Sequence, residues 1–158
     1  MSAQSPGKSQ RVRGTGMILR ILTAAALFID AAVHIHLAPG YQAGNPVGIG
    51  QGNLFLLESA AAVLSGLYVL LRGSRAAYAV AFVVAFSAFI AVVAYRYVNI
   101  PAFGPFPAMY EPIWFFEKSL SAVAEGAGAV LAAVGFVRAG RRTPPSRAPS
   151  PTEAPTSQ

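Results

Sequence analysis

Four ionisable side chains stand inside otherwise apolar stretches of this chain: Asp30, His34, Glu58 and Glu125. Asp30 and His34 are four residues apart, so on a helix they share one face, where the carboxylate can accept a hydrogen bond from the imidazole and fix its tautomer. A charge in the bilayer core costs about 2.5–3.5 kcal/mol on insertion scales, so such residues usually face a bundle interior or a cavity. We therefore expect these four residues to form a buried polar cluster.

Helical geometry places the four residues at similar depths. At a rise of about 1.5 Å per residue, all four fall in the outer half of one membrane bundle. Nearer the outer rim, three further residues are candidate counter-charges: Arg96, Glu117 and Lys118. The alternative is structural, with the cluster pairing internally to fix the helix register while the three rim residues reach toward water.

The donor types in the cluster allow a metal site. Imidazole and carboxylate ligands suit zinc, copper, iron or manganese, and His34, Glu58 and Glu125 would supply one ligand from each of three helices. Haem is more constrained, because the only two histidines, His34 and His36, lie on one helix. One chain therefore cannot hold a haem between histidines of two helices, although a five-coordinate haem or a site shared in a dimer stays open. Apart from these options, we expect no resident cofactor.

The same residues also allow proton or cation movement, since intramembrane Asp, Glu and His are the usual members of proton relays and cation paths. The chain carries no GxSxG, HExxH or P-loop motif, so we predict that it is not an enzyme. The absence of cysteine excludes disulfides and thiolate chemistry. We favour an accessory or structural membrane role, with proton or cation handling as the alternative and metal or haem binding as the second alternative.

The elements that must position the cluster are four apolar segments. The chain is 54% hydrophobic and only 11% charged, with a mean hydropathy of +0.51, which excludes an ordinary soluble domain. Each segment is near the roughly 20 residues that a helix needs to cross a bilayer, and none alternates with period two. We predict an all-α four-helix integral membrane bundle over residues 17–137, with helices at about 17–38, 53–71, 76–98 and 112–137.

Basic residues flank these segments asymmetrically. The chain has 12 Lys and Arg against 6 Asp and Glu, a net charge of +6. Most of the basic residues precede or lie at the start of the first segment, separate the second from the third, or follow the fourth: Lys8, Arg11, Arg13, Arg20, Arg72, Arg75, Arg138, Arg141, Arg142 and Arg147. The positive-inside rule then places both termini in the cytoplasm. We expect the protein to lie in the cytoplasmic (inner) membrane. We expect the lipid bilayer, other membrane proteins or a second copy as partners, and no nucleic acid.

Two tails and two loops complete the chain. Residues 1–16 are polar and basic and residues 138–158 are rich in proline, so we expect both tails to be disordered. The loops 39–52 and 99–111 would face outward, the first glycine-rich and suited to tight turns, the second with aromatic residues suited to a membrane interface. On the last segment, Ala124, Gly128 and Ala132 form a small-residue stripe that allows close helix contact.

The stretch 32–73 carries a family resemblance. The residues that match are Val33, His34, Leu37, Gly40, Tyr41, Ile49, Gly50, Leu54, Phe55, Leu56 and Leu57. Together with Glu125 in the last helix, this pattern resembles uncharacterised four-helix integral membrane proteins of high-GC actinobacteria, in which the first helix ends in a VHxxL motif and a Gly-Tyr loop follows. Gln42 departs from the basic residue that is typical after that tyrosine. The resemblance implies a membrane location and four helices, and it implies no activity.

Overall fold

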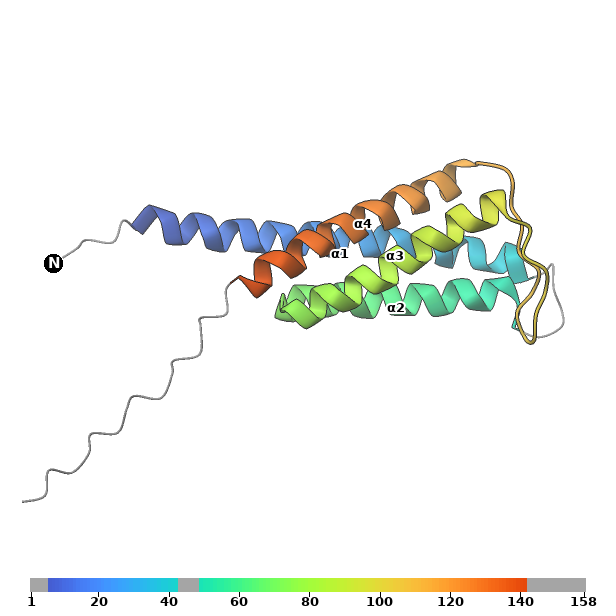
Figure 1. Ribbon diagram of the computed structural model, residues 1–158, viewed down its shortest axis with the longest axis horizontal. Coiled ribbons are helices and arrows are strands. Elements are labelled where there is room, and N and C mark those ends of the chain that lie inside the picture. The colour runs from blue at the N-terminus through green and yellow to red at the C-terminus, as the bar shows by residue number, and fades with distance from the viewer. Residues whose placement is uncertain (1–5, 43–48, 142–158) are drawn as a thin grey trace, which may run out of the picture.

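The computed structural model describes residues 6–42 and 49–141, with side-chain surroundings from residue 16 onward. Four helices make up this part of the chain: α1 (Pro6–Gln42), α2 (Gln51–Arg72), α3 (Arg75–Tyr97) and α4 (Phe116–Gly140). They lie side by side in one bundle, with α1 against α2 and α4, and α3 against α4 and α2 (Figure 1). The predicted all-α four-helix fold is confirmed.

Each helix is long and apolar enough to cross a membrane. The portions that meet this description are 22 to 27 residues long: Gly16–Gln42, Gln51–Arg72, Arg75–Tyr97 and Phe116–Gly140. Large hydrophobic side chains on the helices also point away from the bundle, among them Leu64, Leu71, Val123 and Val130. Apolar surface of this extent is suited to lipid and not to water, so the bundle fits a membrane-spanning protein.

Helix α1 is longer than predicted at both ends. It begins at Pro6, so residues 6–16 of the segment that was expected to be a disordered tail are helical. Proline is tolerated in the first turn, and the lysine, glutamine and arginines that follow have high helix propensity. The helix also continues past Pro39 to Gln42. Residues 1–5 and 142–158, which belong to the two predicted tails, lie outside the described residues.

Helix α4 begins later and ends later than predicted. Its N-cap residue, Phe115, has extended backbone angles (φ −126°, ψ 170°), and the helix then runs from Phe116 to Gly140. Proline disfavours a helical conformation for the residue before it, which keeps the chain extended around Glu111 and Pro112. The predicted start at residue 112 is therefore corrected to residue 116.

A tight turn joins α2 to α3. Gly73 ends α2 in the left-handed region (φ 51°, ψ 28°), which glycine adopts without a steric penalty. Ser74 then caps α3, because its hydroxyl accepts a hydrogen bond from the backbone N–H of Ala77 at 3.2 Å. This turn forms one end of the bundle, which we call the arginine end because Arg20, Arg75 and Arg138 lie there.

Small residues bring the helices close together. Fully buried alanines on three helices, Ala62, Ala81 and Ala132, belong to one apolar core together with Leu27 of α1. A Cβ atom at Gly128 would meet the Cβ atoms of Ala26 and Ala85 at 3.5 Å each, so the small-residue stripe on α4 contacts α1 and α3 within the same chain. The half of the bundle toward the arginine end is therefore filled by an apolar core.

The segment between α3 and α4 folds over the opposite end, called here the loop end. Ile100 and Met109 exchange two backbone hydrogen bonds of 3.2 and 2.9 Å, which makes a short hairpin. The amide of Ile49, just before α2, donates to the carbonyl of Pro105 at 3.0 Å. In Figure 1 this hairpin lies across the ends of the helices at this end of the bundle. The hairpin thereby brings the residues that follow it, such as Glu111, to the loop end of the bundle interior.

Candidate functional site

Asp30 and Glu125 meet in the interior of the bundle. Asp30 on α1 and Glu125 on α4 are each only 1% exposed. The hydroxyl of Ser121, one turn before Glu125, lies 2.8 Å from Asp30 Oδ1 and 2.8 Å from Glu125 Oε1. Ser121 thus bridges two carboxyl groups that belong to different helices.

His34 joins the same group one turn farther along α1. Its Nδ1 lies 3.0 Å from Asp30 Oδ1 and 3.1 Å from the carbonyl oxygen of Asp30, as the i, i+4 spacing predicts. The same nitrogen is 3.8 Å from Glu58 Oε2 on α2. The ring packs edge-on against Phe55, with centroids 4.9 Å apart. The Asp/His/Glu cluster inferred from sequence is therefore present, with members on three helices.

The cluster contains more acceptors than donors. Asp30 Oδ2, both carboxylate oxygens of Glu58 and Glu125 Oε2 are buried and have no hydrogen-bond partner among the described residues. Buried acceptors without a donor destabilise a protein by about 1–3 kcal/mol each, more when charged. The arrangement is consistent with a positively charged occupant, either protons or a metal ion.

Counting hydrogens at Ser121 makes this requirement specific. A serine hydroxyl has a single hydrogen to donate, yet it contacts two carboxyl oxygens at hydrogen-bond distance. If both carboxyl groups were ionised, one of the contacts would join two acceptors. A proton on either Asp30 or Glu125 turns that contact into a hydrogen bond in which the carboxylic acid donates to the serine oxygen.

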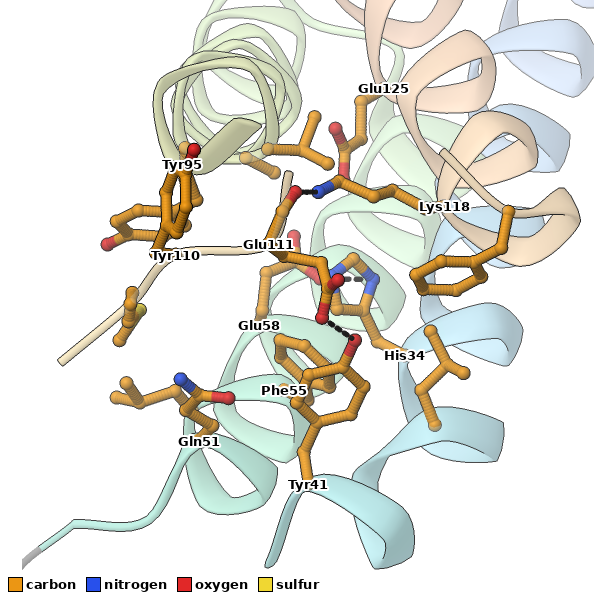
Figure 2. Close-up of a pocket in the computed structure, with 17 residues that line it drawn as sticks. His34, Tyr41, Gln51, Phe55, Glu58, Tyr95, Tyr110, Glu111, Lys118 and Glu125 are labelled. Carbon is orange, nitrogen blue, oxygen red and sulfur yellow. Dashed lines mark hydrogen bonds and ion pairs between the residues drawn. The ribbon is translucent and has the colours of Figure 1, made fainter. Parts of the chain in front are cut away.

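A cavity of about 230 Å³ connects this cluster to the loop end. His34, Glu58 and Glu125 lie on its wall, while Leu54, Ala88 and Val92 are among its apolar lining residues. Figure 2 shows His34, Glu58 and Glu125 facing one interior space between the helices. The cluster is thus adjacent to a space large enough for several water molecules.

Three polar side chains line the part of this cavity nearest the loop end. Tyr41 donates a hydrogen bond of 3.2 Å to Glu111 Oε2, and the ammonium group of Lys118 donates to the backbone carbonyl of Glu111 (Figure 2). Lys118 is 6% exposed and its Nζ lies 5.5 Å from the centre of the Trp114 ring. We call Tyr41, Glu111 and Lys118 the cap of the cavity.

The three predicted rim residues have different surroundings. Lys118 belongs to the cap and is buried, although we expected it near the outer rim. Glu117 is half-buried in the first turn of α4. The Arg96 guanidinium lies 5.1 Å from the centre of the Tyr97 ring, and its Nε has no hydrogen-bond partner among the described residues. Neither Glu117 nor Arg96 lines the cavity.

The geometry also identifies a set of candidate metal ligands. Asp30, His34 and Glu125 each offer one ligand atom, and these three atoms lie within 4.8 Å of one another. This set contains Asp30 where the sequence suggested Glu58, whose carboxylate stays close to the imidazole instead. Ligands of a tetrahedral zinc ion at about 2.1 Å lie about 3.4 Å apart, so the group would contract slightly around such an ion. His36 is exposed and cannot serve as a further ligand at this cluster.

The chain matches no family model, no curated protein and no solved structure.

Sequence reasoning missed three participants. Ser121 is absent from the predicted cluster, although its i, i+4 relation to Glu125 is visible in the sequence. Tyr41 and Glu111 lie 70 residues apart, and no local pattern indicates that they meet. Their contact depends on how the hairpin folds over the loop end.

Proposed function

We propose that this chain is a multi-pass membrane protein that handles a proton, held between Asp30 and Glu125 and exchanged with the loop end. The observation that carries this proposal is the position of Ser121, whose single hydroxyl hydrogen faces two buried carboxyl oxygens. A shared proton satisfies both contacts and lowers the negative charge that the bundle must bury.

His34 and Glu58 provide the path for this proton. His34 contacts Asp30 through Nδ1 and lies on the cavity wall. It can therefore take a proton from cavity water on its other ring nitrogen and pass the hydrogen of Nδ1 to the carboxyl pair. Glu58 lies on the same wall, 3.8 Å from the imidazole nitrogen. Between the cavity and the loop end the proton must pass the cap, in which Tyr41 and Lys118 both donate hydrogen bonds to Glu111.

The proton exchanges with one end of the bundle only. Toward the arginine end, Leu27, Ala62, Ala81 and Ala132 fill the interior. The buried hydroxyl of Thr23, in the same half, donates to the carbonyl of Leu19 in its own helix and does not extend the polar path. The proposal is therefore a one-sided proton site and not a continuous channel.

Location and orientation belong to the same proposal. The basic residues support placement in the cytoplasmic membrane with both termini in the cytoplasm, and the loop end would then face outward. The resemblance to actinobacterial four-helix membrane proteins is part of the same proposal and implies a membrane location and four helices, without an orientation. An accessory or structural role, in which the cluster only fixes helix register, is the competing interpretation, and neither requires enzymatic activity.

A rapid acid jump tests the proposal. The full-length protein in lipid nanodiscs is first held at an alkaline pH at which the carboxyl pair has released its shared proton, and is then mixed with a weakly buffered acidic solution that contains a pH-sensitive dye. Surface groups take up protons at once, whereas we expect a slower uptake phase from the capped cluster. This phase disappears in the Asp30→Asn, Glu125→Gln double variant and persists in Glu117→Gln, which changes a carboxyl group outside the cavity. A folded wild-type protein without the slow phase, or a double variant that keeps it, would overturn the proposal.

A metal ion is the second candidate, and the proximity of the ligand atoms of Asp30, His34 and Glu125 supports it. A first-row divalent metal would satisfy carboxylate oxygens that have no partner among the described residues. Elemental analysis of purified protein, with His34→Ala as the control, separates the two candidates. A stoichiometric metal that His34→Ala loses favours the metal, while metal-free protein with the slow uptake phase favours the proton.

A further inference from the structure

Three arginines gather around a hollow at the arginine end, opposite to the cluster described above. The hollow measures about 370 Å³ and lies between α1, α4 and the turn that joins α2 to α3. Its lining includes Arg20, Arg75 and Arg138, and no acidic residue lines it. The feature is therefore a positively charged recess built from three separate helices.

Two of these arginines are positioned by neighbouring groups. A Cβ atom at Gly73 would overlap the guanidinium of Arg20, so this side chain packs directly against the glycine in the turn. The guanidinium carbon of Arg75 lies 4.3 Å from the centre of the Phe136 ring, a cation–π contact with α4. The positions of these two side chains thus follow from packing within the bundle.

The charges in the hollow have no counter-charge among the described residues. Among the described residues, ion pairs are formed only by His34 with Asp30 and with Glu58, and all three residues belong to the loop-end half of the bundle. Guanidinium groups that converge repel one another unless an anion lies between them. The recess therefore suits an anion.

The hollow also lies at the level of the bilayer surface. Its lining residues stand at the ends of the membrane-spanning portions: Gly16 and Arg75 begin two of them, and Arg138 is in the last turn of a third. Phosphate head groups of lipids occupy this level. Guanidinium groups bind phosphate with paired, geometrically matched hydrogen bonds.

We propose that this hollow is a binding site for a phosphate group at the membrane surface, held by Arg20, Arg75 and Arg138. The same chemistry serves a phosphate diester in the head group of an anionic lipid or free inorganic phosphate. The proposal is independent of the proton site, because the apolar core separates the two.

The test measures lipid and phosphate binding to the full-length protein in a neutral detergent. The probes are phosphatidylglycerol, zwitterionic phosphatidylcholine and inorganic phosphate, and bound molecules are counted by native mass spectrometry. The test variant carries Arg20→Gln, Arg75→Gln and Arg138→Gln. A matched control, with Arg72→Gln, Arg96→Gln and Arg141→Gln, removes the same number of charges from positions that do not line the hollow.

We expect phosphatidylglycerol to bind the wild type in preference to phosphatidylcholine. The test variant should lose about tenfold or more in affinity for it, as expected when charge-assisted contacts to phosphate are removed, while the control changes less than about twofold. Competition by inorganic phosphate at this site identifies the free ion as a ligand, and lack of competition assigns the site to the lipid head group. If the triple variant does not fold, Arg75→Gln alone, at an exposed position, is compared with Arg72→Gln in the same assay. Equal losses in test and control variants, or equal binding of both lipids, would overturn the proposal.

Discussion

The hydroxyl of Ser121 lies 2.8 Å from the carboxyl group of Asp30, although the two residues are 91 positions apart in the chain. This contact joins α4 to α1 at a point where both side chains are buried. Because Glu125 contacts the same hydroxyl, the serine links two acidic residues that would otherwise repel each other. This link should therefore affect both the free energy of unfolding and the rate of proton exchange.

Replacing Ser121 by alanine should destabilise the bundle. The change leaves Asp30 and Glu125 without the hydroxyl that both contact, and we expect a loss of about 1–3 kcal/mol in the free energy of unfolding. Denaturant unfolding in detergent, followed by circular dichroism, measures this loss. The control is Ser119→Ala, whose exposed hydroxyl donates to the carbonyl of the N-cap residue Phe115, so its effect should stay within about 0.5 kcal/mol. Similar losses in both variants would argue against a special role for Ser121.

Replacing Glu125 by glutamine should be tolerated far better. If one carboxyl group of the pair already carries a proton, the neutral amide has nearly the same shape and can donate to the serine oxygen. The free energy of unfolding should then change by less than about 1 kcal/mol in the same assay. A loss as large as that of Ser121→Ala would mean that the folded protein depends on a charged Glu125.

Removing the tyrosine hydroxyl from the cap should speed proton exchange. Tyr41→Phe deletes the hydrogen bond to Glu111, and a hydrogen bond to a charged group contributes about 1.5–3 kcal/mol. We expect the slow phase of proton uptake after an acid jump to accelerate about tenfold. Tyr97→Phe, an exposed tyrosine at the end of α3, provides the control and should leave the rate unchanged. Unaltered kinetics in Tyr41→Phe would show that the cap does not limit access.

A methyl group at Gly52 should disturb the loop end. A Cβ atom there would overlap the backbone carbonyl of Ala38, so α1 and α2 could not keep their separation. Gly52→Ala should therefore cost about 1–3 kcal/mol, as overpacking typically does. Gly40→Ala, where no atom lies within 4 Å of the added carbon, should have a much smaller effect. Thermal unfolding of the two variants compares them, and equal melting temperatures would count against the close approach of these helices.

The fold could be predicted from sequence because its determinants are local. Continuous apolar segments of membrane-spanning length fix the number and type of the helices, and the spacing of Asp30 and His34 places both on one face. The N-terminal extension of α1 was not predicted, because a polar stretch with high helix propensity and little apolar surface is compatible with both a helix and a disordered tail.

The full site required knowledge of which helices are neighbours. The depth of Glu58 and Glu125 follows from residue counting, but their direction around the helix axis depends on the packing of small residues such as Gly128. The cap depends on a hairpin that brings Glu111 to Tyr41, and no periodicity in the sequence encodes that contact.

The most direct test of the central claim is infrared spectroscopy of the carboxyl groups. The account predicts that wild-type protein in nanodiscs at neutral pH shows the C=O stretching band of a protonated carboxylic acid in an apolar setting, shifted in deuterated water. The band should vanish in the Asp30→Asn, Glu125→Gln double variant and persist in Glu117→Gln. A wild-type spectrum without this band, or a double variant that retains it, would contradict a proton held between Asp30 and Glu125.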